Sequence, residues 1–186
     1  MRIRNTDTVY GSIAQLLHWL IAALILNQFV LARMADGASL VQQLGIMARH
    51  KSFGMTVFAL AILRLAWRHT NPLPPPPPGQ PRHQQLIART SHYLMYALLF
   101  MLPVTGWSTS SAANFPVSYF GLFTLPDLLA PNESWVEPLR LTHELLFNAL
   151  AAIVALHTGA ALFHHFIVKD GVLKRMIPGL GGDHSA

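Results

Sequence analysis

Apolar residues gather in four long blocks, which are separated by polar, proline-rich or aromatic segments. The blocks cover residues 13–31, 50–67, 92–110 and 141–168. A helix of about 20 residues crosses the ~30 Å hydrocarbon core of a bilayer, and its backbone satisfies its own hydrogen bonds there. The pattern therefore predicts an all-α protein, an integral membrane four-helix bundle built as a single domain over residues 1–186.

Two connections between the blocks have distinctive compositions. Five consecutive prolines, Pro74 to Pro78, follow the second block. They predict a stiff polyproline II spacer, which we interpret as a tether between helices rather than as a ligand for an SH3-type domain. The segment 112–138 is long and rich in aromatic residues, so we expect it to lie as a lid over the outer end of the bundle.

Lysine and arginine are unevenly distributed over the connections, and cytoplasmic loops of membrane proteins carry the excess of these residues. Nine of the 13 lie at the two ends of the chain or between the second and third blocks. These are Arg2, Arg4, Arg64, Arg68, Arg82, Arg89, Lys169, Lys174 and Arg175. We therefore expect both termini to be cytoplasmic, as an even number of spans requires.

The composition supports a membrane protein and limits its chemistry. Only 11% of residues are charged, whereas a soluble domain has about 25%. Cysteine is absent, which excludes disulfide scaffolds, thiolate metal sites, iron–sulfur clusters and covalently attached c-type haem. The net charge of +5 is explained by the cytoplasmic excess of basic residues, and no basic patch with interleaved aromatics indicates a nucleic-acid partner. Ten histidines leave imidazole as the main ligand.

Four histidines lie within the apolar blocks, where an ionisable residue indicates function. Given the expected orientation, His18 lies near the cytoplasmic face and His50 near the outer face. The fourth block descends from outside, so His143 is near the outer face and His157 lies 14 residues further, about 21 Å deeper. Fourteen residues amount to four turns less about 40°, so both side chains project from nearly one face of the helix.

The depths match in two pairs, His50 with His143 and His18 with His157. Two stacked bis-histidine sites are what two b haems need, because each iron takes one ligand from each of two facing helices. Single membrane histidines are commonly packing residues, but the matched depths favour iron ligands. A zinc or copper transporter is the alternative metal protein, and it would place more carboxylates than Glu144 along the spans.

Glycines and arginines near these histidines fit the same interpretation. Gly54 and Gly159 lie close to His50 and His157, and a macrocycle can lie flat against a helix at glycine. Arginine pairs with haem propionates through two hydrogen bonds. We expect this role for the arginines at the cytoplasmic end of the bundle, Arg64, Arg68 and Arg89.

Quinone reduction needs proton donors near the inner haem and the lipid–water boundary. We assign this role to His92, His164, Lys169 and Trp19, since imidazole titrates near physiological pH. Interfacial packing is the alternative for His92. It is also the alternative for His165, which follows His164 in the sequence. The remaining histidines, His69, His83 and His184, are expected to be solvated in loops.

In these features the chain resembles the bacterial cytochrome b561 family. The matching motifs are those around His18 and Trp19, the start of the second block from His50 to Gly54, and Arg64 to Arg68 before the prolines. Ala88 to Tyr93, Leu141 to Glu144 and Ala155 to Asp170 complete the match. The resemblance implies a multi-pass cytochrome b of the bacterial inner membrane with two haem b groups, a haem-iron electron-transport protein.

Within that family, short single-domain members resemble superoxide oxidase, an oxidoreductase that takes electrons from superoxide outside and reduces ubiquinone. Arg49 and Lys51 beside His50 are then candidates for attracting the superoxide anion, the alternative being ordinary snorkelling side chains. A second function remains open, that of a cytochrome b subunit linking a periplasmic dehydrogenase to the quinone pool. The third is a structural or transport protein without haem.

Overall fold

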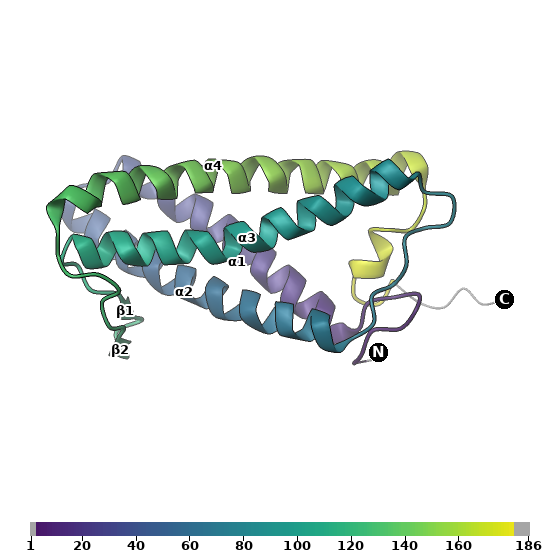
Figure 1. Cartoon of the computed structure of the whole chain (residues 1–186), viewed down its shortest axis with the longest axis horizontal. Helices are drawn as coiled ribbons and strands as arrows, with labels where there is room; N and C mark the ends of the chain where they lie inside the picture. The colour runs from purple at the N-terminus through teal and green to yellow at the C-terminus, as the bar shows by residue number, and fades with distance from the viewer. Residues whose placement is uncertain (1–2, 181–186) are drawn as a thin grey trace. The chain divides into compact units, whose positions relative to one another are not determined.

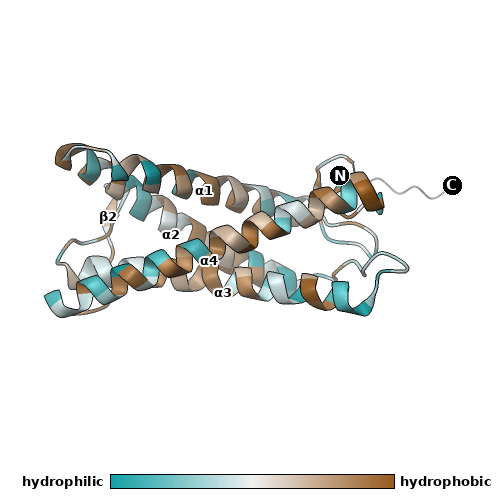
Figure 2. Cartoon of the chain, turned by 90° about the horizontal axis from the view of Figure 1, so that it is seen from above, coloured by the Kyte–Doolittle hydropathy of each residue, from teal (hydrophilic) through white to brown (hydrophobic). Residues whose placement is uncertain are grey.

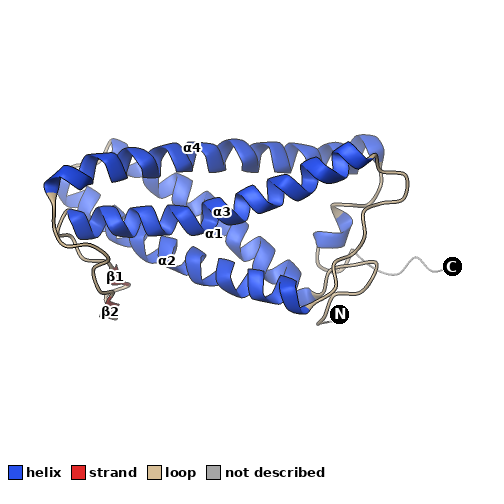
Figure 3. Cartoon of the chain, viewed as in Figure 1, coloured by secondary structure: helices blue, strands red, loops and turns tan. Residues whose placement is uncertain are grey.

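The computed structural model describes residues 3–180, so the expectations for Arg2, His184 and the end of the glycine-rich tail lie outside the described residues. In the described part the chain forms four long helices and one short hairpin (Figure 3). The helices are α1 (Ser12–Asp36), α2 (Leu40–Thr70), α3 (Arg82–Ala112) and α4 (Glu133–Phe163). The hairpin pairs β1 (Ser118–Tyr119) with β2 (Phe123–Thr124) in antiparallel register (Figure 1).

Three expected blocks lie within one helix each, and the fourth covers α4 and the π-helical turn His164–Val168 that follows it, which confirms the all-α fold. The helices also begin before the blocks. α2 starts ten residues before His50, and α4 starts eight residues before Leu141. At the start of α2, Gln42 makes one of the two bonds of a capping box, because the Ser39 N–H donates to Gln42 Oε1 at 3.0 Å. Asn132 caps α4 by accepting the Ser134 N–H at 3.0 Å. Polar caps therefore set the helix ends, outside the apolar blocks.

Three helices are long and apolar enough to cross a membrane: α1, α2, and α4 with the turn that follows it, to Val168. Few residues of these apolar segments are buried inside the protein, as expected for helices in contact with lipid. Along the ribbon of α4, hydrophilic residues are frequent near the start and hydrophobic residues predominate further on (Figure 2). The fourth expected span lies within α3, which has the length but the more polar composition, so that span stays a prediction.

The chain divides into two compact units, and all four helices contribute residues to both. Unit 1 comprises residues 1–20, 62–96 and 151–186, and unit 2 comprises residues 21–61 and 97–150. In unit 2 a small core forms around Leu31, Ala35 and Ile46, with Met47 and Phe53 packed against it.

In unit 1, the proline spacer is held by side chains from two other segments. Asn5 Nδ2 donates to the Pro72 carbonyl at 2.9 Å, and Arg175 Nη1 donates to the Pro75 carbonyl at 2.7 Å. These bonds support the interpretation of the prolines as a tether. After α4, a π-helical turn at His164–Val168 ends at Lys169, whose φ of 60° is left-handed.

In unit 2, the segment 112–138 contains the hairpin and the first turns of α4. Trp107 Nε1 donates to the Pro126 carbonyl at 3.0 Å, and the Leu128 N–H donates to Ser111 Oγ at 3.0 Å. The hairpin itself packs against α2 (Figure 1). The expected lid is thus an ordered structure attached to α2 and to the end of α3.

Gly11 marks the closest backbone approach in unit 1, because a Cβ there would lie 2.3 Å from the Ile3 carbonyl oxygen. We predict that Gly11→Ala lowers the free energy of unfolding by about 1–3 kcal/mol, since backbone atoms must shift. Gly37→Ala is the control, because nothing lies within 4 Å of its Cβ position. Thermal unfolding of both variants in detergent measures the effect, and equal midpoints would contradict this account of Gly11.

Candidate functional site

The first histidine pair lies in unit 1 and joins α1 to α4. The rings of His18 and His157 have centroids 6.3 Å apart and planes at 71°. Both side chains are half-buried. The structure therefore brings together the two residues that depth matching assigned to the inner site.

The second histidine pair lies in unit 2 and joins α2 to α4. The ring centroids of His50 and His143 are 6.2 Å apart, with planes at 74°. The two pairs thus have nearly the same geometry, and α4 supplies one histidine to each.

The ring separations fit one metal ion held between two imidazoles. A ligating nitrogen lies about 2 Å from a metal and the ring centre about 1 Å further, so two opposed rings have centroids about 6 Å apart. In residues 3–180 no group of three or more His, Cys, Asp or Glu could hold a metal ion. Each pair therefore suits a metal that brings its remaining ligands with it, as haem iron does with the four nitrogens of its macrocycle.

His143 is oriented by residues of α3. Its Nδ1 lies 3.0 Å from the Leu102 carbonyl and 3.1 Å from Thr105 Oγ1. An Nδ1–H donated to these oxygens leaves the lone pair of Nε2 free for a metal. Gly106 makes the close approach possible, because a Cβ there would lie 3.0 Å from His143 Cε1.

His50 is held differently. Its Nδ1 is buried and has no hydrogen-bond partner among the described residues. Its carbonyl accepts a hydrogen bond from Gln28 Nε2 at 2.9 Å, and a Cβ on Gly54 would lie 2.9 Å from the same nitrogen. Gly54 therefore makes room for Gln28, a contact that the sequence argument for a macrocycle did not include. At Gly159 nothing lies within 4 Å of the Cβ position.

A third imidazole, His92 of α3, joins the first pair. Its ring centroid lies 5.3 Å from that of His157, and its Nδ1 donates to the Ala88 carbonyl at 2.6 Å. Arg64 lies close enough to His18, His92 and His157 to interact with their charges.

The three arginines proposed to bind propionates differ in exposure and in which histidines they lie near. Arg64 is half-buried, and its Nη1 donates to the Ala14 carbonyl at 3.0 Å, one turn before His18. Arg68 is close enough to His92 for their charges to interact. Arg89 is exposed on α3. The structure therefore brings Arg64 to the first pair and Arg68 to the neighbouring His92.

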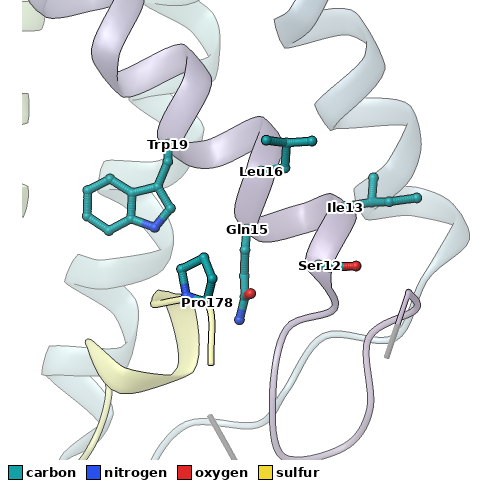
Figure 4. Close-up of a pocket in the computed structure, with 6 residues that line it drawn as sticks. All are labelled: Ser12, Ile13, Gln15, Leu16, Trp19 and Pro178. Atoms are coloured by element: carbon teal, nitrogen blue, oxygen red, sulfur yellow. The ribbon is translucent and has the colours of Figure 1, made fainter. Parts of the chain in front are cut away.

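Trp19 lines an apolar pocket of about 470 Å³ between the start of α1 and the C-terminal segment (Figure 4). The other lining residues are Ser12, Ile13, Gln15, Leu16 and Pro178. The Trp19 indole N–H donates to the Met176 carbonyl at 2.8 Å, and its ring lies 5.2 Å from that of His18. An apolar pocket beside a histidine of the first pair suits a hydrophobic ligand.

The other residues proposed for quinone lie apart from this pocket. His164 Nδ1 contacts Asp170 Oδ2, and both side chains are largely buried. Lys169 is exposed at the left-handed turn between them. Within the described residues no contact joins His164 or Lys169 to Trp19 or His92.

The basic residues of unit 2 fall into two groups. Arg33 pairs with Asp36 at 3.7 Å, and Arg140 pairs with Glu137 and Glu144. In the described part of the chain, Arg49 and Lys51 bond instead to carbonyl oxygens. Arg49 Nε donates to Gly45 at 3.2 Å, and Lys51 Nζ donates to Phe115 at 3.1 Å. The two cations of unit 2 that have no carboxylate partner therefore flank His50.

Several residues of these sites were not identified from the sequence. Gln28 was visible as a polar residue in an apolar block, which is the signal that could have linked it to the site. Leu102, Thr105 and Gly106 carry no such signal, because their contact with His143 depends on how two helices face each other. Asp170 gave no signal beyond its position six residues after His164.

Comparison with known proteins gives a consistent result. The family described as prokaryotic cytochrome b561 matches residues 9–179. Cytochrome b561 homolog 2 of Escherichia coli (strain K12) is 32% identical over 186 residues, 99% of both chains. Cytochrome b561 homolog 1 of the same strain is 32% identical over 69% of this chain and 73% of its own. The probable superoxide oxidase CybB of Yersinia pestis is 28% identical over 87% of this chain and 92% of its own.

The fit of Gly106 against His143 can be tested directly. We expect Gly106→Ala to lower haem affinity at the second pair about 10- to 100-fold, because the new methyl group displaces an oriented ligand. Gly45→Ala is the matched control in unit 2, since its Cβ position is empty to 4 Å. The haem-to-protein ratio after purification measures the loss, and an unchanged ratio in Gly106→Ala would remove this role.

Proposed function

Because the chain belongs to the prokaryotic cytochrome b561 family, whose members are haem b oxidoreductases of the membrane, we propose that it carries electrons across the bacterial inner membrane from superoxide to ubiquinone. The whole of residues 1–186 acts as one cytochrome b domain with four spans and both termini cytoplasmic. The two histidine pairs, with centroid separations of 6.2 and 6.3 Å, carry the proposal.

In this proposal His18 and His157 hold an inner haem b, and His50 and His143 hold an outer one. A haem b held by two histidines would supply a one-electron carrier and would not bind oxygen. The ligands His143 and His157 are 14 residues apart on one continuous helix, about 21 Å by helical rise. Helix side chains around each pair exclude water, and Arg64, Arg68 and Arg89 provide positive charge for the propionates of the inner group.

On the outer side, Arg49 and Lys51 attract the substrate anion toward His50. Two superoxide anions each lose one electron and leave as dioxygen. Ubiquinone takes both electrons and two protons and becomes ubiquinol. The name of the Yersinia pestis relative supports superoxide as the donor, and so does the uncompensated positive charge beside His50.

On the inner side, the proposed quinone residues are Trp19, His92, His164 and Lys169. Trp19 and His92 are supported by their ring contacts with His18 and His157. The apolar pocket at Trp19 suits the isoprenoid part of a quinone. His164 and Lys169 provide donors near the cytoplasmic end of α4, with Asp170 orienting His164.

The proposal is tested on the purified protein and on single histidine variants. We expect two haem b groups per chain, with one lost in His18→Ala or His157→Ala and the other lost in His50→Ala or His143→Ala. A pyridine haemochrome assay gives the stoichiometry. The expectation that His69 and His83 lie in loops was wrong, because His69 lies in the last turn of α2 and His83 in the first turn of α3; both are nevertheless exposed. His69→Ala therefore serves as the control and keeps both groups.

The donor and acceptor are tested on the same preparation. A superoxide-generating system should reduce the protein, and added ubiquinone should reoxidise it. A protein that binds haem but reacts with neither superoxide nor quinone alone, and copurifies with a dehydrogenase, is instead an electron-transfer subunit. If the purified protein lacks the absorption of reduced haem b, the proposal is refuted.

The attraction of superoxide gives a separate prediction. Arg49→Ala and Lys51→Ala should each slow reduction by superoxide roughly two- to threefold at low salt and flatten its dependence on ionic strength, because the local positive potential falls. Arg33→Ala, which removes a cation already paired with Asp36, should have a smaller effect. Stopped-flow measurements over a salt series decide between these outcomes, and unchanged salt dependence in both variants would refute steering.

A further inference from the structure

The segment between α3 and α4 exposes an uncharged, apolar tip. Residues 113–126 contain no Asp, Glu, Lys or Arg. At the turn of the hairpin, Phe120 is 46% exposed, Leu122 is 77% exposed and Phe123 is 55% exposed. Large apolar side chains at one exposed turn indicate a surface that binds an apolar partner.

The hairpin is attached to the side of α2 by specific hydrogen bonds (Figure 1). Ser52 Oγ donates to the Ser118 carbonyl at 3.1 Å and accepts the Phe120 N–H at 3.0 Å. The hydroxyls of Thr56 and Tyr119 lie 3.1 Å apart, and the rings of Phe53 and Phe120 lie 5.1 Å apart. The position of the turn along α2 is therefore well defined.

Ser52, Phe53 and Thr56 give the position of the hairpin along α2. These three residues belong to the apolar block 50–67, which predicts a membrane span within α2. The hydrogen bonds of Ser52 and Thr56 therefore place the hairpin beside the first turns of that predicted span.

Part of the backbone of the hairpin is hydrogen-bonded within the protein. Ser118 pairs with Thr124 and Tyr119 with Phe123, while the Leu122 N–H donates to the Tyr119 carbonyl at 2.9 Å. The tight turn is made by Phe120 and Gly121, whose φ angles are 49° and 75°. These bonds lower the cost of moving the hairpin from water to the lipid–water interface, where backbone groups without a protein partner still reach water.

We propose that the β1–β2 hairpin inserts Phe120, Leu122 and Phe123 into the lipid–water interface of the bilayer, beside the second histidine pair. The occupant of this surface is phospholipid rather than a protein. The tip continues the apolar surface of α2, carries no charge for a polar partner, and is aromatic like the residues that anchor proteins at membrane interfaces. The proposal goes beyond the electron-transfer function and does not depend on haem.

The absence of cysteine allows unique labelling of the intact chain. Leu122→Cys and Phe123→Cys are labelled separately with a small fluorophore, and the full protein is reconstituted in phosphatidylcholine–phosphatidylglycerol nanodiscs. Asp127→Cys, five residues beyond Leu122 and exposed in the same loop, is the aqueous reference. Leu63→Cys, exposed on the apolar part of α2, is the lipid reference.

Nitroxide groups on the lipids near the headgroup should quench the labels at Leu122 and Phe123 at least about threefold more than the label at Asp127, since interfacial insertion places side chains 5–10 Å below the headgroup boundary. Aqueous iodide should quench in the opposite order. Because two positions are labelled separately, a local distortion at one of them does not determine the result. Iodide quenching at both positions equal to that at Asp127 would show that the tip lies in water and would overturn the proposal.

Discussion

A bilayer core offers no water to polar groups, and this constraint explains most of the arrangement described above. Backbone groups are satisfied by helices, and polar side chains within the spans must find partners on neighbouring helices. Thr56 and Gln28 do so through Tyr119 and the His50 carbonyl. Among the described residues, the buried atoms left without a partner are Asn27 Nδ2, Gln28 Oε1, Trp67 Nε1, Asn71 Oδ1 and His50 Nδ1, and of these only the imidazole nitrogen belongs to a good iron ligand. In an apolar environment such a nitrogen indicates a bound group.

The two histidine pairs are contacted by different neighbouring residues. On α4, His143 is oriented by α3 through the Leu102 carbonyl and Thr105, and Gly106 allows the contact. His50 has no comparable partner on its ring, and its helix is instead joined to α1 through Gln28. Unequal surroundings at two sites of similar geometry are one means by which a protein can give two identical cofactors different potentials.

Much of the fold could be predicted from the sequence, because a helix that crosses a bilayer must consist mainly of apolar residues. Apolar blocks located all four helices, but they could not locate the helix ends, which Ser39 and Asn132 determine outside the membrane. Histidine depths predicted which rings come together, since depth follows from position along a helix. The contacts of Thr105 with His143 and of Ser52 with the hairpin depend on how helices are rotated about their axes, and spacing alone does not determine that. Asp170 reaches His164 only because a π-helical turn and a left-handed residue reverse the chain.

The C-terminal segment forms one wall of the Trp19 pocket, and the way it is held affects which sequence changes the pocket tolerates. Gln15 and Trp19 donate to the backbone carbonyls of Arg175 and Met176, so these two bonds do not depend on which side chains occupy positions 175 and 176. Homologous chains can therefore diverge at those positions and keep the pocket wall, provided that the C-terminal segment follows the same path. Shortening the chain before residue 175 would remove the wall, whereas a tag fused after residue 180 would leave it intact.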